Sequence, residues 1–411
     1  MTRTWTDAWT GARVLGDRTA RRYLGAVLVN GFGTNALWLA AGVWVKELTG
    51  SDGLAALCML AMWAPTVAGP LLGPLADRVR RKPLLVGLNL GMAVLLPVLV
   101  TVDSAAGVWL ILTVLLAYGT TAVLSDAAEA ALMPSVIPGD LLGDFNGLRM
   151  TATEGMKLAA PLAGAGLYAA YGGAAVAVLD AVTCLLAAAL IASVRVREKA
   201  PERPAEGWWA RTAAGGRELW VRPALRPLVL AAGAAMLCAG VNGALVYAVV
   251  EGLGRSPAYA GLLAAVQGVG SVLAGVAAGP ALRRLGERRF AVAGIALTGA
   301  AVLLRAVPWE AAALVSGVAI GAGLPCVLIA ALTAVQRSVP DAVLGRTAAT
   351  ASTVMFTPNV IGLVVGAALV GAVPYGPLLL AVGPVLLLTA LQLERSAART
   401  AARSPSDASP A

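Results

Sequence analysis

The chain has 411 residues, of which 59% are hydrophobic and only 13% charged, with a mean hydropathy of +0.80. A soluble domain carries about twice that share of charge, so the composition excludes an ordinary soluble protein and favours one that crosses a membrane many times. The net charge of +9 does not indicate nucleic-acid binding, because the basic residues fall in short clusters between apolar runs. Histidine is absent, which removes the commonest general base and metal ligand. The four cysteines lie singly in apolar runs, so we expect no metal and no cofactor.

The N-terminal residues 1–22 contain charge and no apolar core, so they are not a cleavable signal peptide, and we expect a cytosolic segment. After them the chain alternates between apolar runs and short polar breaks. A helix crosses the hydrocarbon core with about 20 apolar residues. On this criterion we predict an all-α membrane protein with twelve spans, at 23–46, 53–77, 83–102, 106–131, 147–170, 174–194, 227–250, 258–282, 290–306, 311–335, 343–371 and 375–393.

The distribution of Lys and Arg tests this layout. With the N-terminus in the cytosol, 27 basic residues fall on the cytosolic side and only three, Lys46, Arg255 and Arg305, on the other. Such a bias follows the positive-inside rule. We therefore predict that both termini are cytosolic, in a membrane of the bacterial inner-membrane type.

The longest polar stretch, 195–226, follows the sixth span and divides the chain into two six-helix halves, 23–194 and 227–394. Its Pro, Glu and Arg content is typical of a cytosolic linker, and its tryptophans suggest a short amphipathic helix at the membrane surface. The low-complexity tail 395–411 is expected to be disordered.

The two halves resemble each other. A shift of 206 positions places GPLADRVRRK at 73–82 over GPALRRLGER at 279–288, and Gly69 over Gly275. A shift of 202 places VIPGDLLGD at 136–144 over SVPDAVLGR at 338–346. Internal repeats of this kind are typical of transporters that bind substrate between two halves.

The GPLADRVRRK stretch resembles the signature loop of the major facilitator superfamily, with matches that include Gly73, Asp77, Arg78, Arg81 and Lys82. It departs from that pattern at Arg80, where the family usually has glycine. The resemblance covers nearly the whole chain and implies a twelve-helix transporter with two six-helix halves. It also implies alternating access rather than enzymatic catalysis.

Finer resemblances point to export. GMKLAAPLAGA at 155–165 is similar to a degraded form of the family's antiporter motif, with matches at Pro161 and Gly164. ALMPSVIP at 131–138 and VQRSVP at 335–340 are similar to the branch of macrolide and siderophore exporters. The resemblance implies drug or natural-product efflux, including multidrug resistance.

The basic residues of the signature loop are enough to keep it on the cytosolic side of the membrane. Acidic residues contribute little to orientation, so Asp77 needs another explanation. The resemblance implies a gating latch in which Asp77 caps a helix of the other half through the helix dipole. It also implies that Arg81 reaches an acid at the cytosolic end of the fourth span, with Asp126 and Glu129 as candidates. Gly69 and Gly73 permit close helix contact.

Charged groups at membrane depth are costly and usually functional. Glu154 and Lys157 lie three apart in the fifth span, either as a self-neutralising ion pair or as part of a proton and substrate pathway. Asp180 is interpreted as structural. Other polar residues within spans are helix–helix contacts or substrate contacts; they are Asn30, Asn35, Trp38, Asn242, Tyr247, Gln267 and Asn359.

No G-x-x-x-x-G-K-[ST] phosphate loop is present, so transport would draw on an ion gradient rather than on ATP by that route. We predict a monomeric secondary transporter that exchanges protons for amphipathic small molecules across the lipid bilayer, with no nucleic-acid partner. The alternatives are an importer or facilitator of a polar metabolite, a sensor on the same fold and, more remotely, a membrane-embedded enzyme.

Overall fold

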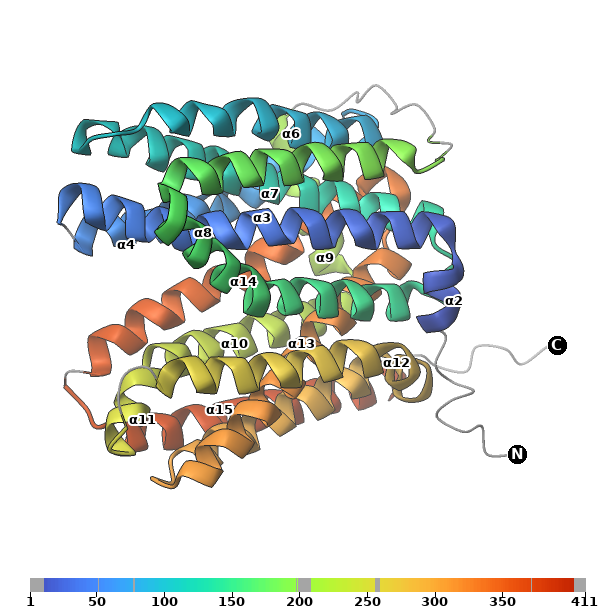
Figure 1. Ribbon diagram of the computed structural model, residues 1–411. Coiled ribbons are helices and arrows are strands. Elements are labelled where there is room, and N and C mark those ends of the chain that lie inside the picture. Colours follow the sequence, from blue (N-terminus) through green and yellow to red (C-terminus); the bar gives the residue numbers. More distant parts are fainter. Residues whose placement is uncertain are drawn as a thin grey trace. The chain divides into compact units, whose positions relative to one another are not determined.

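The computed structural model describes residues 11–50, 52–76, 78–196, 198, 208–255, 259–370 and 372–402. Every regular element within these ranges is helical (Figure 1). The first part of the chain contains α2 (Gly11–Gly16), α3 (Arg18–Thr49), α4 (Asp52–Trp63), α5 (Gly69–Ala76), α6 (Arg81–Leu95), α7 (Val108–Val136) and α8 (Leu142–Ser193). The rest contains α9 (Trp208–Val221), α10 (Leu225–Ala244), α11 (Val246–Gly252), α12 (Tyr259–Arg305), α13 (Glu310–Ser338), α14 (Asp341–Val370) and α15 (Tyr375–Ala402). Three short 3₁₀ helices, η1 (Ala64–Ala68), η2 (Leu96–Thr101) and η3 (Ala105–Gly107), join neighbouring elements.

Nine helices within the described ranges are long and apolar enough to cross a membrane. Two of them, α8 and α12, each cover two predicted spans. Inside each of these helices a glycine has non-helical backbone angles, and this kink separates the two spans. Gly172 in α8 has φ +75° and Gly286 in α12 has φ +74°, a left-handed conformation that glycine adopts without steric cost. The all-α class is therefore confirmed, and the total of twelve spans stays a prediction.

The predicted second span is divided into α4, η1 and α5. Pro65 in η1 and Pro70 at the second residue of α5 explain the division, since each lacks the N–H that an unbroken α-helix would need there, whereas Pro74 lies inside α5. The last of these pieces, α5, carries Gly69 and Gly73. The prolines thus set this short helix apart from α4.

Several helices extend beyond the predicted spans, α3 and α15 among them. The α3 helix begins at Arg18, because the Asp17 side chain accepts a hydrogen bond from the Ala20 amide at 2.8 Å and so caps the first turn. The α15 helix continues to Ala402, into the tail that we expected to be disordered, and the alanine-rich sequence SAARTAA favours helix there. Residues 403–411 of that tail lie outside the described residues.

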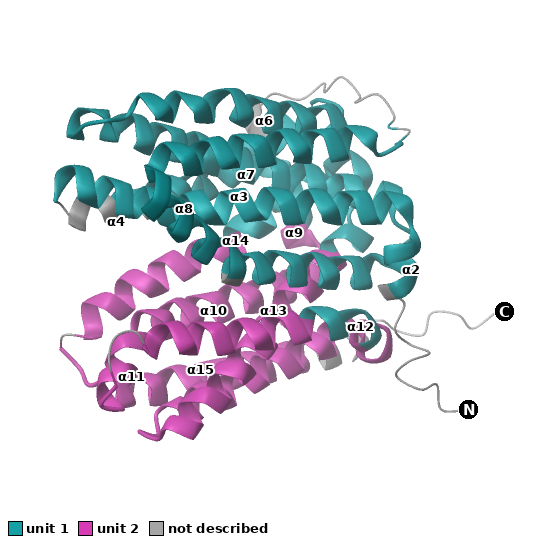
Figure 2. Ribbon diagram, in the orientation of Figure 1, with its two compact units in different colours: residues 1–218, 275–280, 335–353 teal, residues 219–274, 281–334, 354–411 magenta. Residues whose placement is uncertain are grey.

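The chain forms two compact units (Figure 2). Unit 1 comprises residues 1–218 together with 275–280 and 335–353, and unit 2 comprises 219–274, 281–334 and 354–411. The division at 218 falls inside the predicted linker, where α9 is helical as expected. Two segments from the second half of the chain therefore belong to unit 1.

The core of unit 1 is built around α3 and α8, which approach each other through small residues. A Cβ at Gly164 would lie 2.8 Å from the Ala36 Cα, and a Cβ at Gly173 would overlap the Trp44 ring. Two apolar clusters extend this contact, one around Trp44 and Tyr118 and the other around Tyr23 and Phe145. Close packing through small residues is how helices associate in a membrane, where burial of apolar surface alone gives little attraction.

Candidate functional site

The glycines of α5 lie directly against the first turns of α14 within unit 1. A Cβ at Gly73 would lie 2.8 Å from the Ala349 Cβ and 2.9 Å from the Arg346 Cα, closer than real Cβ atoms approach. A Cβ at Gly69 would overlap the Thr353 hydroxyl, which donates a hydrogen bond to the Thr66 carbonyl at 2.9 Å. The close helix contact expected at Gly69 and Gly73 is present.

Arg81 ties the signature loop to the start of α14. Its Nη1 donates to Asp341 Oδ1 at 2.7 Å and to the Ala131 carbonyl at 2.9 Å, and its Nη2 donates to the Asp341 carbonyl at 2.7 Å. We expected Arg81 to reach Asp126 or Glu129; in this structure its guanidinium instead contacts Asp341 and the Ala131 carbonyl. Asp77, which we expected to cap a helix of the other half, lies outside the described residues.

Glu198, at the start of the predicted linker, is a functional candidate that our sequence analysis missed. Its two carboxylate oxygens accept hydrogen bonds from the backbone amides of Arg81 and Lys82, at 2.7 and 2.8 Å. These amides open α6, whose N-cap residue Arg80 makes no side-chain cap. A helix N-terminus needs such acceptors and its dipole favours a negative charge, so Glu198 caps α6 from 116 residues away. No local motif reveals a cap over that separation.

The acids of α7 serve a different partner. Glu129 is buried and pairs with Arg149 of α8 at 3.2 Å. Asp126, three residues earlier on α7, adds a second negative charge near the same guanidinium. These residues hold α7 to α8 rather than α7 to the signature loop. Arg78 lies exposed in the turn before α6.

The second copy of the repeat makes an equivalent packing in unit 1. Gly275 and Gly279 of α12 lie against the start of α8, where a Cβ at Gly275 would overlap the Thr151 hydroxyl and one at Gly279 the Asp144 carboxylate. Thr151 and Asp144 are the residues that the shift of 202 places under Thr353 and Arg346. The two shifts found in the sequence therefore pair the positions that touch.

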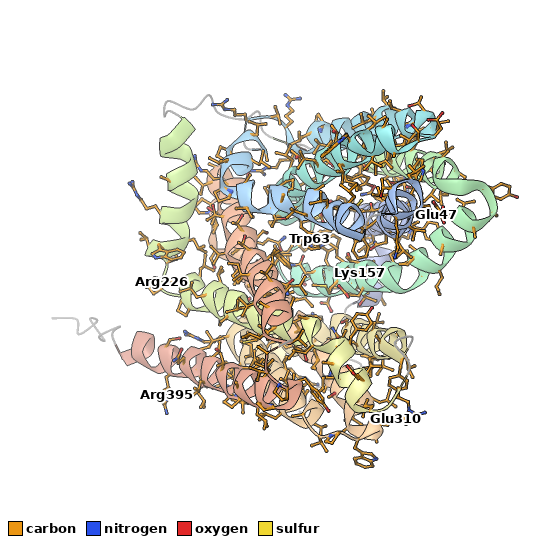
Figure 3. The ribbon with its side chains drawn as sticks, turned by 90° about the vertical axis from the view of Figure 1, so that its left-hand side faces the viewer. Glu47, Trp63, Lys157, Arg226, Glu310 and Arg395 are labelled. Carbon is orange, nitrogen blue, oxygen red and sulfur yellow. The ribbon has the colours of Figure 1, made fainter. Side chains whose placement is uncertain are left out.

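Glu154 and Lys157 form an ion pair of 2.7 Å on α8. Their side chains are 21% and 53% exposed, so the lysine is not enclosed by protein. Figure 3 labels Lys157 on this helix. Lys157 lies ten residues after the predicted start of the fifth span at 147, or about 15 Å along the helix at 1.5 Å per residue. That depth is near the middle of a hydrocarbon core about 30 Å thick.

The polar residues of the first span form helix contacts. Asp180 is fully buried; its Oδ1 accepts bonds from the Thr183 and Tyr118 hydroxyls at 3.0 and 3.3 Å, and the Tyr118 hydroxyl meets that of Thr34 at 2.7 Å. Asn30 accepts a weak bond from Cys184 Sγ at 3.7 Å. This cluster joins α3, α7 and α8, which agrees with a structural role for Asp180. Asn35 bonds within its own helix, to the Gly31 carbonyl, and Trp38 is half-buried nearby.

The candidates of unit 2 do not form one cluster. Asn242 is buried and accepts a bond from Arg305 Nη1 at 3.2 Å, while Arg305 Nε donates to Ser316 Oγ at 3.1 Å. Asn359 donates to the Met236 carbonyl at 3.0 Å. Gln267 is half-buried on α12 and Tyr247 is exposed on α11. Arg305, which we placed on the outer side at the end of the ninth predicted span, is the last residue of α12 and is buried.

The described residues contain long apolar helices and a basic loop that is hydrogen-bonded to the start of a neighbouring helix, an arrangement that fits a membrane protein with many spans. The family model of the Major Facilitator Superfamily matches residues 23–250 and again 228–409, and the chain belongs to that family. Family membership assigns the protein to membrane transport rather than to enzymatic catalysis. A search of curated proteins finds no match.

Solved structures agree in fold. A bacterial homologue of the iron transporter ferroportin, in an outward-facing state, is 16% identical, with a TM-score of 0.76 over 93% of this chain and 100% of that one. The human organic anion transporter MFSD10 (TETRAN) is 15% identical, with a TM-score of 0.74 over 92% of this chain and 99% of that one. At such identities the likeness shows the fold alone.

Proposed function

We propose that the protein is a proton-coupled exporter of amphipathic small molecules in a bacterial inner membrane, a monomer with both termini in the cytosol. The strong bias of Lys and Arg to one side supports the orientation. The resemblance to exporter motifs at 131–138, 155–165 and 335–340 supports the direction of transport.

The Glu154–Lys157 pair carries the proposal of proton coupling. A half-exposed ammonium at mid-membrane depth would be costly against lipid, so it favours a water-accessible path along α8. Within such a path, Glu154 can accept a proton when Lys157 turns away and release it when the pair forms again. A cationic substrate would compete with the proton for the same carboxylate.

The contacts of Arg81 and Glu198 support the gating part of the proposal. They fasten α6, α7 and the start of α14 together at one end of unit 1, which under the proposed orientation is the cytosolic end. Transport by alternating access requires these bonds to break and form again in each cycle.

Efflux of ethidium from proteoliposomes under an imposed pH gradient tests the coupling. Glu154→Gln should abolish gradient-driven efflux yet permit downhill ethidium exchange, because the amide cannot bind and release the proton. Lys157→Ala should shift the pH optimum, since the ammonium partner is removed. Asp103→Asn, which removes an exposed carboxylate from a loop, is the matched control and should leave both rates unchanged. Undiminished gradient-driven efflux by Glu154→Gln would disprove this coupling site.

A further inference from the structure

A cavity of about 510 Å³ opens between α3 and α8 within unit 1. Its walls include Leu39, Val43 and Glu47 of α3, and Ala165, Tyr168 and Gly172 of α8. The volume is within the range of pockets that hold drug-sized ligands, of roughly 300–1,000 Å³. A single carboxylate in otherwise apolar and aromatic walls gives the cavity a definite chemistry.

The cavity lies far from the latch. The starts of α3 and α8 meet where Tyr23 packs against Phe145, with ring centroids 6.0 Å apart. Glu47 is two residues before the end of α3, and Gly172 is the kink that ends the first straight part of α8. The cavity is therefore at the opposite end of these helices, which is the outer end under the proposed orientation.

Glu47 is the charged group of this cavity. Its Oε2 accepts a hydrogen bond from the Tyr168 hydroxyl at 2.6 Å, and among the described residues no cation is paired with it. Lys46 precedes it by about 100° around the helix and is not part of the lining. The hydroxyl holds one carboxylate oxygen in place, and the exposed side chain leaves the other available to a ligand.

The same face of α8 connects the cavity to the mid-membrane pair. Lys157 and Tyr168 are eleven residues apart, which is about three helical turns, so they project from one side of the helix roughly 16 Å apart. Figure 3 labels Glu47 on α3 and Lys157 on α8. A ligand leaving Glu154 along this face would meet Glu47 next.

We propose that the cavity at Glu47 and Tyr168 is a binding site for organic monocations with an apolar body. This inference rests on the proposed transport function and names its substrate class. The carboxylate supplies the charge, the tyrosine ring can contact the cation through its face, and the apolar walls cover the body of the ligand. One carboxylate is too few for a divalent metal, which takes several oxygen ligands.

Equilibrium dialysis of the full-length protein in detergent tests the site, with tetraphenylphosphonium as the probe and tetraphenylborate as an anion of the same shape. Glu47→Gln should weaken tetraphenylphosphonium binding at least tenfold. Tyr168→Phe should weaken it about threefold, because the ring remains but the carboxylate loses its hydroxyl partner. Asp103→Asn should change it less than twofold, and tetraphenylborate should bind the wild type more weakly than the cation does.

Unchanged tetraphenylphosphonium affinity in Glu47→Gln, or equal affinity of the wild type for both probes, would overturn the inference. If Glu47→Gln does not elute as a single folded species, Tyr168→Phe decides: a loss of cation affinity supports the site and an unchanged affinity refutes it. The assay contains no gradient, so it is separable from the coupling test. Loss of binding in Glu47→Gln with intact gradient-driven efflux in Glu154→Gln would refute only the coupling proposal.

Discussion

The α5 helix packs on α14 through Gly69 and Gly73, and the 275–280 segment of α12 packs on α8 through Gly275 and Gly279. In the second packing both helices contribute glycine, since Gly147 stands where the first has Ala349. A Cβ at Gly147 would overlap the Gly275 carbonyl oxygen, so the two backbones touch. In the first packing Ala349 occupies the equivalent position on α14, and its Cβ would lie 2.8 Å from a Cβ at Gly73.

The ion pair between Arg81 and Asp341 in the first packing has no equivalent at the corresponding positions of the repeat. The shifts of the repeat place Glu287 at the position of Arg81 and Gly139 at the position of Asp341. Arg346 and Asp144 also occupy equivalent positions with opposite charge. The repeat therefore preserves helix proximity. The backbone contact at Gly147 belongs to the second packing, and the ion pair between Arg81 and Asp341 belongs to the first. Substitutions of size and of charge should affect the two packings differently.

The largest effect is expected from Gly147→Ala. The added methyl group would force α8 away from the 275–280 segment, since backbone atoms cannot turn aside as a side chain can. We expect ethidium efflux to fall at least tenfold. Gly87→Ala on α6, where no atom lies within 4 Å of the added Cβ, is the control and should be neutral or raise helix stability by about 1 kcal/mol. Wild-type efflux by Gly147→Ala would show that the backbone contact is unimportant.

A smaller effect is expected from Arg81→Ala, which removes three hydrogen bonds from the first packing and none from the second. Ethidium efflux should fall about threefold to tenfold. Arg81→Lys should restore little, because an ammonium lacks the planar fork that reaches Asp341 and the Ala131 carbonyl together. Asp341→Asn should cost less than Arg81→Ala, since the bonds to the two carbonyls remain. Equal efflux by Arg81→Ala and the wild type would remove the latch from the mechanism.

Hydropathy and the internal repeat predicted the helices and the equivalence of the two halves from the sequence. Runs of about 20 apolar residues predicted the helices, and the two shifts predicted which glycines lie at equivalent contacts. The divided second span was not predicted, because the hydropathy count ignores what Pro65 and Pro70 do to a helical backbone.

The candidate site was less predictable. The ion pair of Glu154 and Lys157 follows from helical spacing, and the structure contains it. The partner of Arg81 did not follow, since Asp126, Glu129 and Asp341 are all acids near helix ends and only the packing of α5 on α14 selects Asp341. Glu47 and Tyr168 are 121 residues apart, and no local pattern brings them together.

The smallest effect is expected from Glu198→Ala, which tests how the linker joins the first packing. Removing a helix cap costs about 1 kcal/mol, which corresponds to roughly a fivefold change in the opening equilibrium of the first turn. Hydrogen exchange of the Arg81 and Lys82 amides should therefore accelerate about fivefold, while amides deep in α6 keep their rates. Glu198→Gln retains one acceptor oxygen and should have an intermediate effect.

Because Arg81 still holds Asp341, ethidium efflux should fall less than threefold. Unchanged exchange at both amides in Glu198→Ala would mean that the linker carboxylate does not cap α6, and the first packing would then depend on Arg81 and the two glycines alone.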